Sequence, residues 1–270
     1  MNSRIDKKKT GMLAVISGLV LLSGVFCSRA SAGGVDAEVV WAQSDGLRYE
    51  LYKAAHRDGS WSSPEKLTDD NADNLHPCID TGPDGKKWLV WTAMEQGGYE
   101  IRYTFTSADG QWHEPMRFPS PLPSNIAPSL IVDNANVPWL VWSGNDGLHN
   151  DEIFFSRYVD GKWQKPALVN KANNVPDILP FISQTCDGGY EVTWQGYRSG
   201  QYVTLSSRWQ GDHWGKEHPV SGKRPDDQVC EERLKQKMGP KVELPSFVPG
   251  NRQSFLRVYS PGAAGQYEGK

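Results

Sequence analysis

Apolar residues along this chain fall in short runs of four to eight, and Gly, Asp, Asn and Pro separate the runs. In the stretch that begins at Pro128 the runs are PSLIVD, PWLVWSG, DEIFFSRYV and KWQKPALV. Short apolar or alternating runs bounded by turn residues predict β-strands, because a helix needs a longer segment with a different period. The pattern therefore predicts an all-β fold.

These four runs belong to a unit of about 51 residues that recurs along the chain. An aromatic residue ends the second strand of each unit, and a tryptophan follows a turn that contains Asp and Gly. A proline lies 14 residues before the aromatic that ends the next strand. The strand-ending aromatics are Trp41, Trp91, Trp142, Trp194 and Tyr259, the turns hold Asp58, Trp61, Asp109, Trp112, Asp160, Trp163 and Trp214, and the prolines are Pro77, Pro128, Pro180 and Pro245.

Four strands in a repeat of about 50 residues are typical of a β-propeller blade. We expect a small propeller of four-stranded blades, because each unit can bury its apolar faces only against its neighbours. The expected propeller covers residues 33–260, with units near 38–90, 91–141, 142–193 and 194–259 and a tail at 261–270. Residues that recur with the unit are interpreted as structural, and these include Glu50, Glu100 and Glu152 at the start of the third strands.

The turn sequences DGSWSSP, DGQWHEP and DGKWQKP resemble the Asp-box, or BNR, repeat of sialidase-like β-propellers, whose motif has the form S-x-D-x-G-x-x-W. The resemblance covers residues 38–259 at repeat level, although 107–112 is one or two residues shorter than the motif. It implies a propeller fold. For an enzyme it also implies three arginines that clasp a substrate carboxylate, a tyrosine nucleophile assisted by a glutamate, and an aspartic acid as proton donor.

The chain does not assemble this catalytic set. Arg198 is expected in a loop, whereas Arg48, Arg102 and Arg157 lie in third strands with uncertain facing. A hydrolase that pairs Glu95 with Asp146 or Asp177 is an alternative, which depends on the separation of the carboxylates.

Ring closure is the open point of the expected fold. The chain supplies five copies of the second strand but four of each other strand. A C-terminal strand that starts at Pro245 would complete the first blade and close four blades, with residues 255–259 left over. Five blades, the last one incomplete, and a ring completed by a second chain are the alternatives, since open sheet edges invite aggregation.

The fourth unit contains about 15 extra residues between positions 222 and 245. Asp226 can cap a helix and Gly239 can end it, so we expect a short helix near 226–238. A surface insertion without a function is the alternative.

The first 32 residues have the pattern of a signal peptide. Lys7–Lys9 precede an apolar stretch at 12–26, and Ala30-Ser31-Ala32 follows. A retained membrane anchor is the alternative. We expect an exported protein, periplasmic or extracellular, whose remaining residues include 24 basic and 31 acidic ones. This acidic balance argues against nucleic acid and against an anionic membrane as partners.

The remaining cysteines are Cys78, Cys186 and Cys230, which allow at most one disulfide within the chain. They lie far apart in sequence, so we expect neither a zinc site nor any other cofactor. The acidic run at 69–74 raises calcium as a candidate. It lacks the glycine and the distal glutamate of an EF-hand loop, so an inter-blade turn is preferred.

Strands of a blade alternate in direction, so the loops that join second to third strands share one face with the connections between blades. We call this the variable face, because its residues do not recur, and the Asp-Gly turns lie on the opposite face. Loops on a rigid scaffold carry function, and aromatic, amide and acidic groups suit sugars as well as proteins. The ligand-binding candidates are His76, Glu95, Tyr99, Asn145, Asp146, Asp177, Tyr197 and Arg198.

Two functions remain from the sequence. The first is an exported, non-catalytic β-propeller that recognises a glycan or a protein. The second is a glycoside hydrolase of the sialidase type.

Overall fold

The computed structural model describes residues 37–185, 187–220, 245–248 and 254–258, and the described residues form four blades of antiparallel strands. The first blade contains β18 (Ser254–Val258), β1 (Ala37–Ser44), β2 (Tyr49–Arg57), β3 (Ser60–Trp61) and β4 (Glu65–Lys66). The second contains β5 (Asp73–Thr81), β6 (Lys87–Glu95), β7 (Gly98–Phe105) and β8 (Met116–Arg117). The third contains β9 (Ser124–Val132), β10 (Pro138–Asn145), β11 (Glu152–Val159), β12 (Lys162–Trp163) and β13 (Ala167–Leu168). The fourth contains β14 (Asp177–Gln184), β15 (Tyr190–Arg198), β16 (Gln201–Arg208) and β17 (His218–Pro219).

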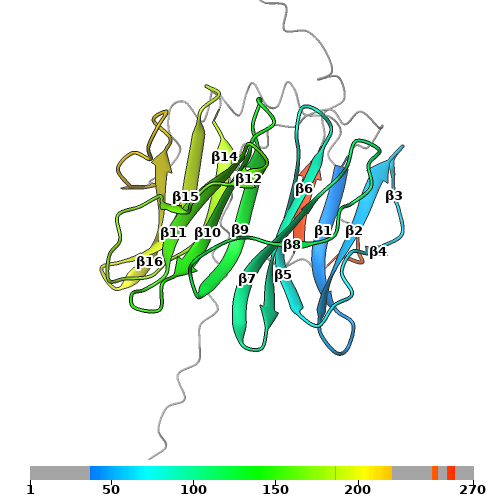
Figure 1. The fold of residues 1–270 in the computed structure, drawn as a ribbon, viewed down its shortest axis with the longest axis horizontal. Coiled ribbons are helices and arrows are strands. Elements are labelled where there is room, and N and C mark those ends of the chain that lie inside the picture. Colours follow the sequence, from blue (N-terminus) through cyan, green and yellow to red (C-terminus); the bar gives the residue numbers. More distant parts are fainter. Residues whose placement is uncertain (1–36, 186, 221–244, 249–253, 259–270) are drawn as a thin grey trace, which may run out of the picture.

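The blades lie side by side, from the β14–β16 blade at one end to the β1–β4 blade at the other (Figure 1). Each blade packs on the next through an inner strand: β5 contacts β1 and β2, β9 contacts β6 and β7, and β14 contacts β10 and β11. We call these boundaries the first, second and third seams. Among the described strands, no comparable packing joins β14 to β18 or β1. The fold is thus the expected all-β propeller of four-stranded blades, in which the short segments β3 and β4, like β12 and β13, together occupy the outermost strand position.

The C-terminal strand completes the first blade. β18 pairs antiparallel with β1, from Ala37 opposite Val258 to Trp41 opposite Ser254. The prediction that a C-terminal strand would do this is confirmed, but the predicted strand was wrong, because the residues thought to be left over form it. Residues 245–248 form no strand, and the Phe247 ring lies 5.6 Å from that of Trp41. Pairing with β1 therefore determines which C-terminal residues form the strand, and the position of Pro245 does not.

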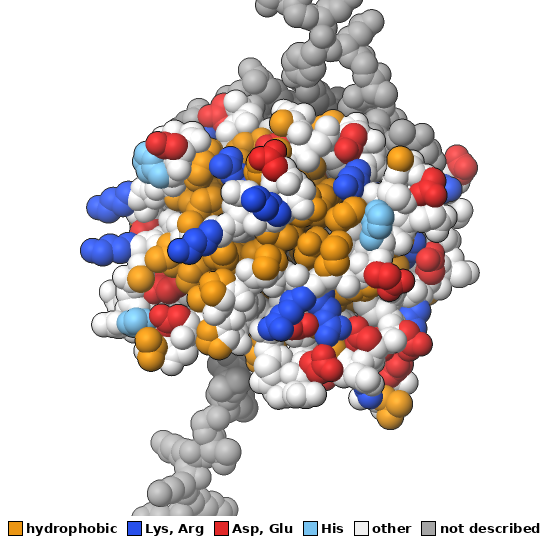
Figure 2. Space-filling view, in the orientation of Figure 1, with side chains coloured by type: hydrophobic (Ala, Val, Ile, Leu, Met, Phe, Trp, Pro, Cys, Tyr) orange, Lys and Arg blue, Asp and Glu red, His pale blue; other side chains and the backbone are white. Residues whose placement is uncertain are grey.

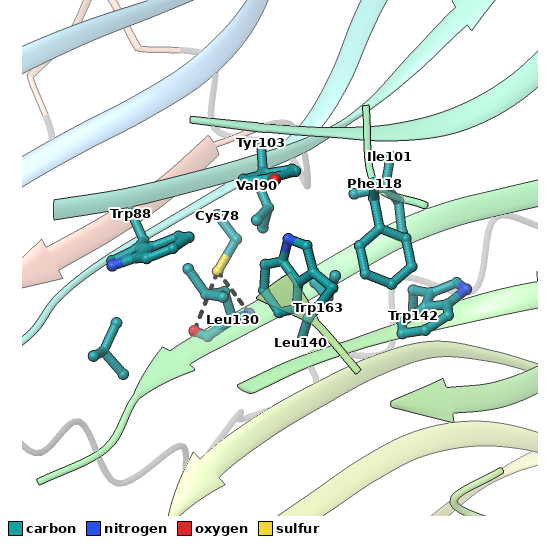
Figure 3. Close-up of a cluster of buried hydrophobic side chains, with 11 residues drawn as sticks. Cys78, Trp88, Val90, Ile101, Tyr103, Phe118, Leu130, Leu140, Trp142 and Trp163 are labelled. Atoms are coloured by element: carbon teal, nitrogen blue, oxygen red, sulfur yellow. Dashed lines mark hydrogen bonds between the residues drawn. The ribbon is translucent and has the colours of Figure 1, made fainter. Parts of the chain in front are cut away.

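The strand-ending tryptophans are the centre of each blade. Trp41, Trp91, Trp142 and Trp194 are at most 1% exposed. The turn tryptophans Trp112, Trp163 and Trp214 lie at the first, second and third seams, as Figure 3 illustrates for Trp163. Its ring stands perpendicular to that of Tyr103 in the preceding blade, with centroids 5.5 Å apart, and its ring nitrogen points toward Tyr103. Such edge-to-face contacts stabilise the seam beyond the apolar area they bury.

Two of the Asp-Gly turns have the backbone of a type I′ hairpin. Asp58 and Gly59 have φ values of 49° and 78°, and Asp160 and Gly161 have 53° and 76°. Both central residues of this turn need positive φ, which Asp tolerates and Gly adopts freely. The turn type explains why the Asp-Gly pair recurs at this place in the unit.

The helix expected at 226–238 lies outside the described residues. None of the described residues is helical, and therefore no helix among them could cross a membrane. Cys78 is buried at the second seam, where its Sγ accepts a hydrogen bond from Leu130 N at 3.3 Å. Cys186 and Cys230 lie outside the described residues.

Candidate functional site

The hairpins that join β1 to β2, β6 to β7, β10 to β11 and β15 to β16 lie together at the lower end of the blades in Figure 1. The inner strands also begin at this end. It is therefore the variable face, and the Asp-Gly turns lie at the other end.

A buried amide or carboxylate marks the start of three inner strands. Trp91 Nε1 donates to Asn74 Oδ1 at 2.7 Å, Trp142 Nε1 to Asn125 Oδ1 at 2.9 Å, and Trp194 Nε1 to Asp177 Oδ1 at 3.0 Å. The spacing between donor and acceptor is 17 residues each time. Asp177, which is fully buried, is the only acid among the three.

Two residues after each of these groups, the inner strand contains a bulge. His76, Ala127 and Leu179 have φ values of 50°, 54° and 56°, and a proline follows each one. The bulge N–H of Ala127 donates to Thr92 Oγ1 of the preceding blade at 3.0 Å. Leu179 N donates in the same way to Ser143 Oγ at 3.0 Å. A residue other than glycine with positive φ is strained unless its surroundings stabilise that conformation. At the second and third seams, a hydroxyl group of the preceding blade provides this stabilisation.

The first seam holds a network of side chains, the first-seam network, made of Glu50, Thr68, Asp70, Asn74 and Arg102. Buried Glu50 accepts a hydrogen bond from Thr68 Oγ1 at 2.5 Å, and Asn74 Nδ2 donates to Asp70 Oδ1 at 3.1 Å. Arg102 NH1 binds Asp70 Oδ2 at 2.7 Å.

Further ion pairs surround this network. The other two nitrogens of Arg102 bind Glu95 at 3.0 Å and Glu100 at 2.8 Å. Lys66 Nζ lies 3.6 Å from Glu50. Figure 2 shows acidic and basic side chains gathered over this part of the surface, in contrast to the apolar side chains at its middle.

The third seam holds the corresponding third-seam network, made of Glu152, Asn170, Asn173, Asp177 and Arg198. Asn170 Nδ2 donates to Glu152 Oε2 at 2.8 Å and to Asp177 Oδ2 at 2.7 Å. Asn173 N donates to Glu152 Oε1 at 2.6 Å, and its side chain donates to Asp177 Oδ2 at 2.8 Å. Arg198 binds Asp177 through NH1 at 3.0 Å. At the first seam the acid, Asp70, precedes the amide, Asn74, by four residues. At the third seam the order is reversed, because the amide, Asn173, precedes the acid, Asp177.

Glu217 completes the coordination of Arg198, whose NH2 lies 2.9 Å and 3.1 Å from the two carboxylate oxygens. Both terminal nitrogens of this guanidinium are therefore engaged by acids of the protein. Burial raises the pKa of Glu152 to about 7, against hydrogen bonds from Asn173 and Asn170 that favour the ionised form. Nearby Asp177 adds to the rise.

The structure brings two of the predicted residues together, Asp177 and Arg198. It separates the others among blades. Glu95 belongs to the second blade and binds Arg102, whereas Asp146 belongs to the third blade and accepts from His149 Nδ1 at 2.8 Å. That contact, with two backbone N–H groups, lowers the pKa of Asp146 to about 2.

The remaining candidates also lie at or near the variable face. Asn145 Nδ2 donates to His149 O at 3.0 Å, so Asn145 shapes its own hairpin. His76 occupies the first bulge and is half-buried, as is Tyr99 on β7. Tyr197 on β15 lies opposite Tyr202 on β16, with ring centroids 5.2 Å apart.

Sequence reasoning missed a second repeat on this face. Residues 44–48 read SDGLR and residues 145–149 read NDGLH, in the equivalent hairpins of the first and third blades. In both, one Asp oxygen accepts the N–H of the leucine and of the next residue. Leu47 is 89% exposed and Leu148 is 85% exposed. A search for short repeats at twice the unit length would have found these hairpin tips.

The four arginines weighed for a sialidase-like clasp have different partners. Arg102 and Arg198 bind acids at the first and third seams, and Arg48 NH1 donates to Asn71 Oδ1 at 2.9 Å. Arg157 lies over the Trp139 ring at 4.9 Å. They therefore form no common binding site for one carboxylate.

The acidic run at 69–74 is used within the fold. Asp69 binds Lys66, Asp70 binds Arg102, and Asp73 Oδ1 accepts from Tyr49 N at 2.8 Å. In the described part of the chain, no three His, Cys, Asp or Glu side chains cluster in a way that could hold a metal ion.

No protein-family model and no curated protein matches the chain. Among solved structures, a protein of unknown function from Dyadobacter fermentans is similar at 11% identity and a TM-score of 0.56, over 73% of this chain and 72% of that one. An endo-arabinase from Bacteroides thetaiotaomicron matches at 17% identity and a TM-score of 0.48, over 75% and 84% of the two chains. The Hadza microbial sialidase Hz136 matches at 12% identity and 0.45, over 65% of this chain and 46% of its own. The likeness to the first is one of fold, and fold does not specify activity.

Proposed function

We propose that this protein is an exported, non-catalytic β-propeller that recognises glycans through its variable face and the adjoining surface of the last blade. The Asp-box character of its turns and its export by the N-terminal segment are parts of the same proposal. No cofactor is included in it.

One observation carries the proposal: the ionisable groups of the variable face are bound to one another, while rings are left accessible. Both terminal nitrogens of Arg102 and of Arg198 bind carboxylates of the protein. Tyr202 is 49% exposed. Sugar recognition needs ring faces for stacking and fixed polar groups for hydroxyls, and it needs no acid and base poised on either side of a bond.

Among the described residues, the carboxyl groups weighed for a glycoside hydrolase, those of Glu95, Asp146 and Asp177, belong to different blades and bind different partners. Glu152, whose pKa of about 7 would suit a general acid, is 4% exposed and accepts hydrogen bonds at both oxygens. A general acid must reach the proton acceptor of the substrate, and buried Glu152 does not present its carboxyl group to solvent. The arginines do not converge as a sialidase clasp would require.

A protein partner is the second candidate, and the two hairpin tips favour it. Leu47 and Leu148 project from hairpins whose Asp side chains satisfy the turn N–H groups. A rigid apolar knob loses little entropy when it enters a pocket, so such tips suit protein interfaces.

A glycan array combined with fluorogenic glycosides tests the proposal on the purified protein, with and without calcium. We expect binding to sugars and no release of the fluorophore. Turnover of any glycoside would overturn the proposal. If neither binding nor turnover occurs, glycan recognition is wrong, and Leu47→Ser and Leu148→Ser become the variants with which to examine a protein interface.

A further inference from the structure

The outer face of the last blade differs from the corresponding faces of the blades before it. Residues directly opposite each other in antiparallel strands share a face, and every second residue along a strand shares it too. On this face of the fourth blade, β15 and β16 pair Thr193 with Ser206, Gln195 with Thr204, and Tyr197 with Tyr202.

In the second and third blades the positions equivalent to Thr193, Thr204 and Ser206 are apolar or aromatic, whereas the position of Gln195 is a hydroxyl residue in both. Val90, Ile101 and Tyr103 of the second blade are buried against the third blade. Val141 and Ile153 of the third blade are buried against the fourth. The fourth blade carries the hydroxyl side chains of Thr193, Thr204 and Ser206 where its neighbours carry these residues, so its face is not built to bury another apolar blade.

Part of this face is accessible. Gln195, Tyr197 and Thr204 are half-buried, and Tyr202 is 49% exposed. Gln195 Nε2 donates to Thr204 Oγ1 at 3.0 Å, which holds the amide in place, and the two tyrosine rings meet at 70°. These four residues are named the Tyr202 platform.

We propose that the Tyr202 platform is the glycan subsite of this protein and that it takes an uncharged sugar chain lying along the strands. This inference rests on the proposed glycan recognition and names its site. The four side chains carry no formal charge, so they complement hydroxyl groups and not carboxylates. One ring can stack on a sugar face while amide and hydroxyl groups take hydrogen bonds from its hydroxyls.

The geometry of the Tyr202 platform sets the direction in which a bound sugar chain would run. Successive positions on one face of a strand are about 7 Å apart, since each residue advances about 3.4 Å. The platform spans one such step, and Thr193 extends it by another. A ligand that follows the strands would therefore contact the tyrosine pair first and the Gln195–Thr204 pair next.

The neighbouring guanidinium does not change this preference. Arg198 follows Tyr197 in sequence, but NH1 is engaged by Asp177 and Tyr197 O, and NH2 by Asp177 and Glu217. A sugar carboxylate is clasped through two free N–H groups side by side, and Arg198 has no such pair to offer. Carboxylated sugars should thus bind more weakly than their uncharged counterparts.

Titration calorimetry with matched uncharged and uronic-acid oligosaccharides tests the inference. We expect Tyr202→Ala to weaken binding of the uncharged chain about tenfold, and Gln195→Ala to weaken it severalfold. Tyr49→Ala is the matched control, because Tyr49 is 43% exposed on the first blade and outside the platform. It should leave the affinity unchanged.

The outcomes separate this inference from the function on which it rests. If oligosaccharides bind but Glu95→Gln or Tyr99→Ala abolishes binding and Tyr202→Ala does not, the platform is wrong and glycan recognition stands. Tighter binding of the uronic-acid chain would also overturn the platform. Failure of every glycan to bind would overturn the function and the platform together. Circular dichroism of each variant ensures that a loss of affinity is not a loss of fold.

Discussion

The first and third seams solve the same packing problem with different placements of charge. Each has a buried glutamate at the start of a third strand and a Thr or Asn that hydrogen-bonds to it. At the first seam the loop supplies the acid, Asp70, and the inner strand supplies the amide, Asn74. At the third seam the loop supplies the amide, Asn173, and the inner strand supplies the acid, Asp177.

This exchange moves a negative charge from the loop to a fully buried position beside a second carboxyl group. The third seam compensates with Arg198, whereas the glutamate of the first seam has Lys66 nearby. A buried charge is tolerated only where partners are arranged around it. The comparison teaches that a repeat position can change from an amide to an acid when an arginine lies within reach.

Loss of the buried acid should have the largest effect. Asp177→Ala would remove the acceptor that Arg198, Asn170, Asn173 and the Trp194 ring nitrogen share, although Arg198 keeps Glu217 and Asn170 keeps Glu152. Breaking a buried ion pair from one side costs about 3–5 kcal/mol. Asn74→Ala removes the hydrogen bonds of an uncharged amide and breaks no ion pair, so it should cost less, about 1–2 kcal/mol. Urea denaturation of both variants measures the difference, and equal losses would contradict the contrast between the seams.

The third seam should also respond to pH. The pKa of Glu152 in the folded protein is about 7, above the ordinary value of 4.5, so the folded protein retains this proton over that interval while the unfolded chain releases it. Its contribution to stability is present below pH 4.5 and is lost as the pH rises through 7. We expect a decline on the order of 3 kcal/mol in the free energy of unfolding. Glu152→Gln should remove this decline, and an unchanged pH profile in that variant would show that another group is responsible.

Exchanging the acid and amide tests whether the two seams are interchangeable. Asp177→Asn and Asn173→Asp should each destabilise the protein, and the double variant should be less destabilised than the sum predicts. We expect a coupling energy of about 1 kcal/mol, because both side chains belong to one network. A double-mutant cycle in urea measures it, and strict additivity would indicate that the two positions act independently.

An exposed ion pair at the edge of the first seam should contribute least to the free energy of unfolding. Arg117 Nε lies 2.8 Å from Glu100 Oε2, but the arginine side chain is 73% exposed. Solvent screens such pairs, so Arg117→Ala should change the free energy of unfolding by no more than about 0.5 kcal/mol. Thermal melting in low and high salt provides the measurement, and a loss comparable with that of Asn74→Ala would contradict this ranking.

Much of the fold follows from local sequence. The all-β propeller of four-stranded blades was predicted correctly because strand patterning and turn chemistry are local properties. The C-terminal strand was assigned to the wrong residues, since its pairing with β1 is a long-range contact that one repeat landmark does not determine. Asp177 and Arg198 were both predicted as candidates, but their pairing depends on strand register.

Other features of the site depend on comparing units with one another. The Tyr202 platform becomes visible only when the outer face of the last blade is aligned with the apolar faces of the earlier blades. The SDGLR and NDGLH tips recur in alternate units, so a search for landmarks in every unit passed over them. Both features are recognised by a difference between repeat units, and not by a residue that all units share.

Calorimetric titration of the purified protein with an uncharged oligosaccharide selected on the array, followed by analysis of the same sample for reducing ends, tests the central claim most directly. The account predicts saturable binding and an oligosaccharide recovered intact. New reducing ends formed faster than in a protein-free control would contradict it, because the protein would then be a glycoside hydrolase and not a recognition module.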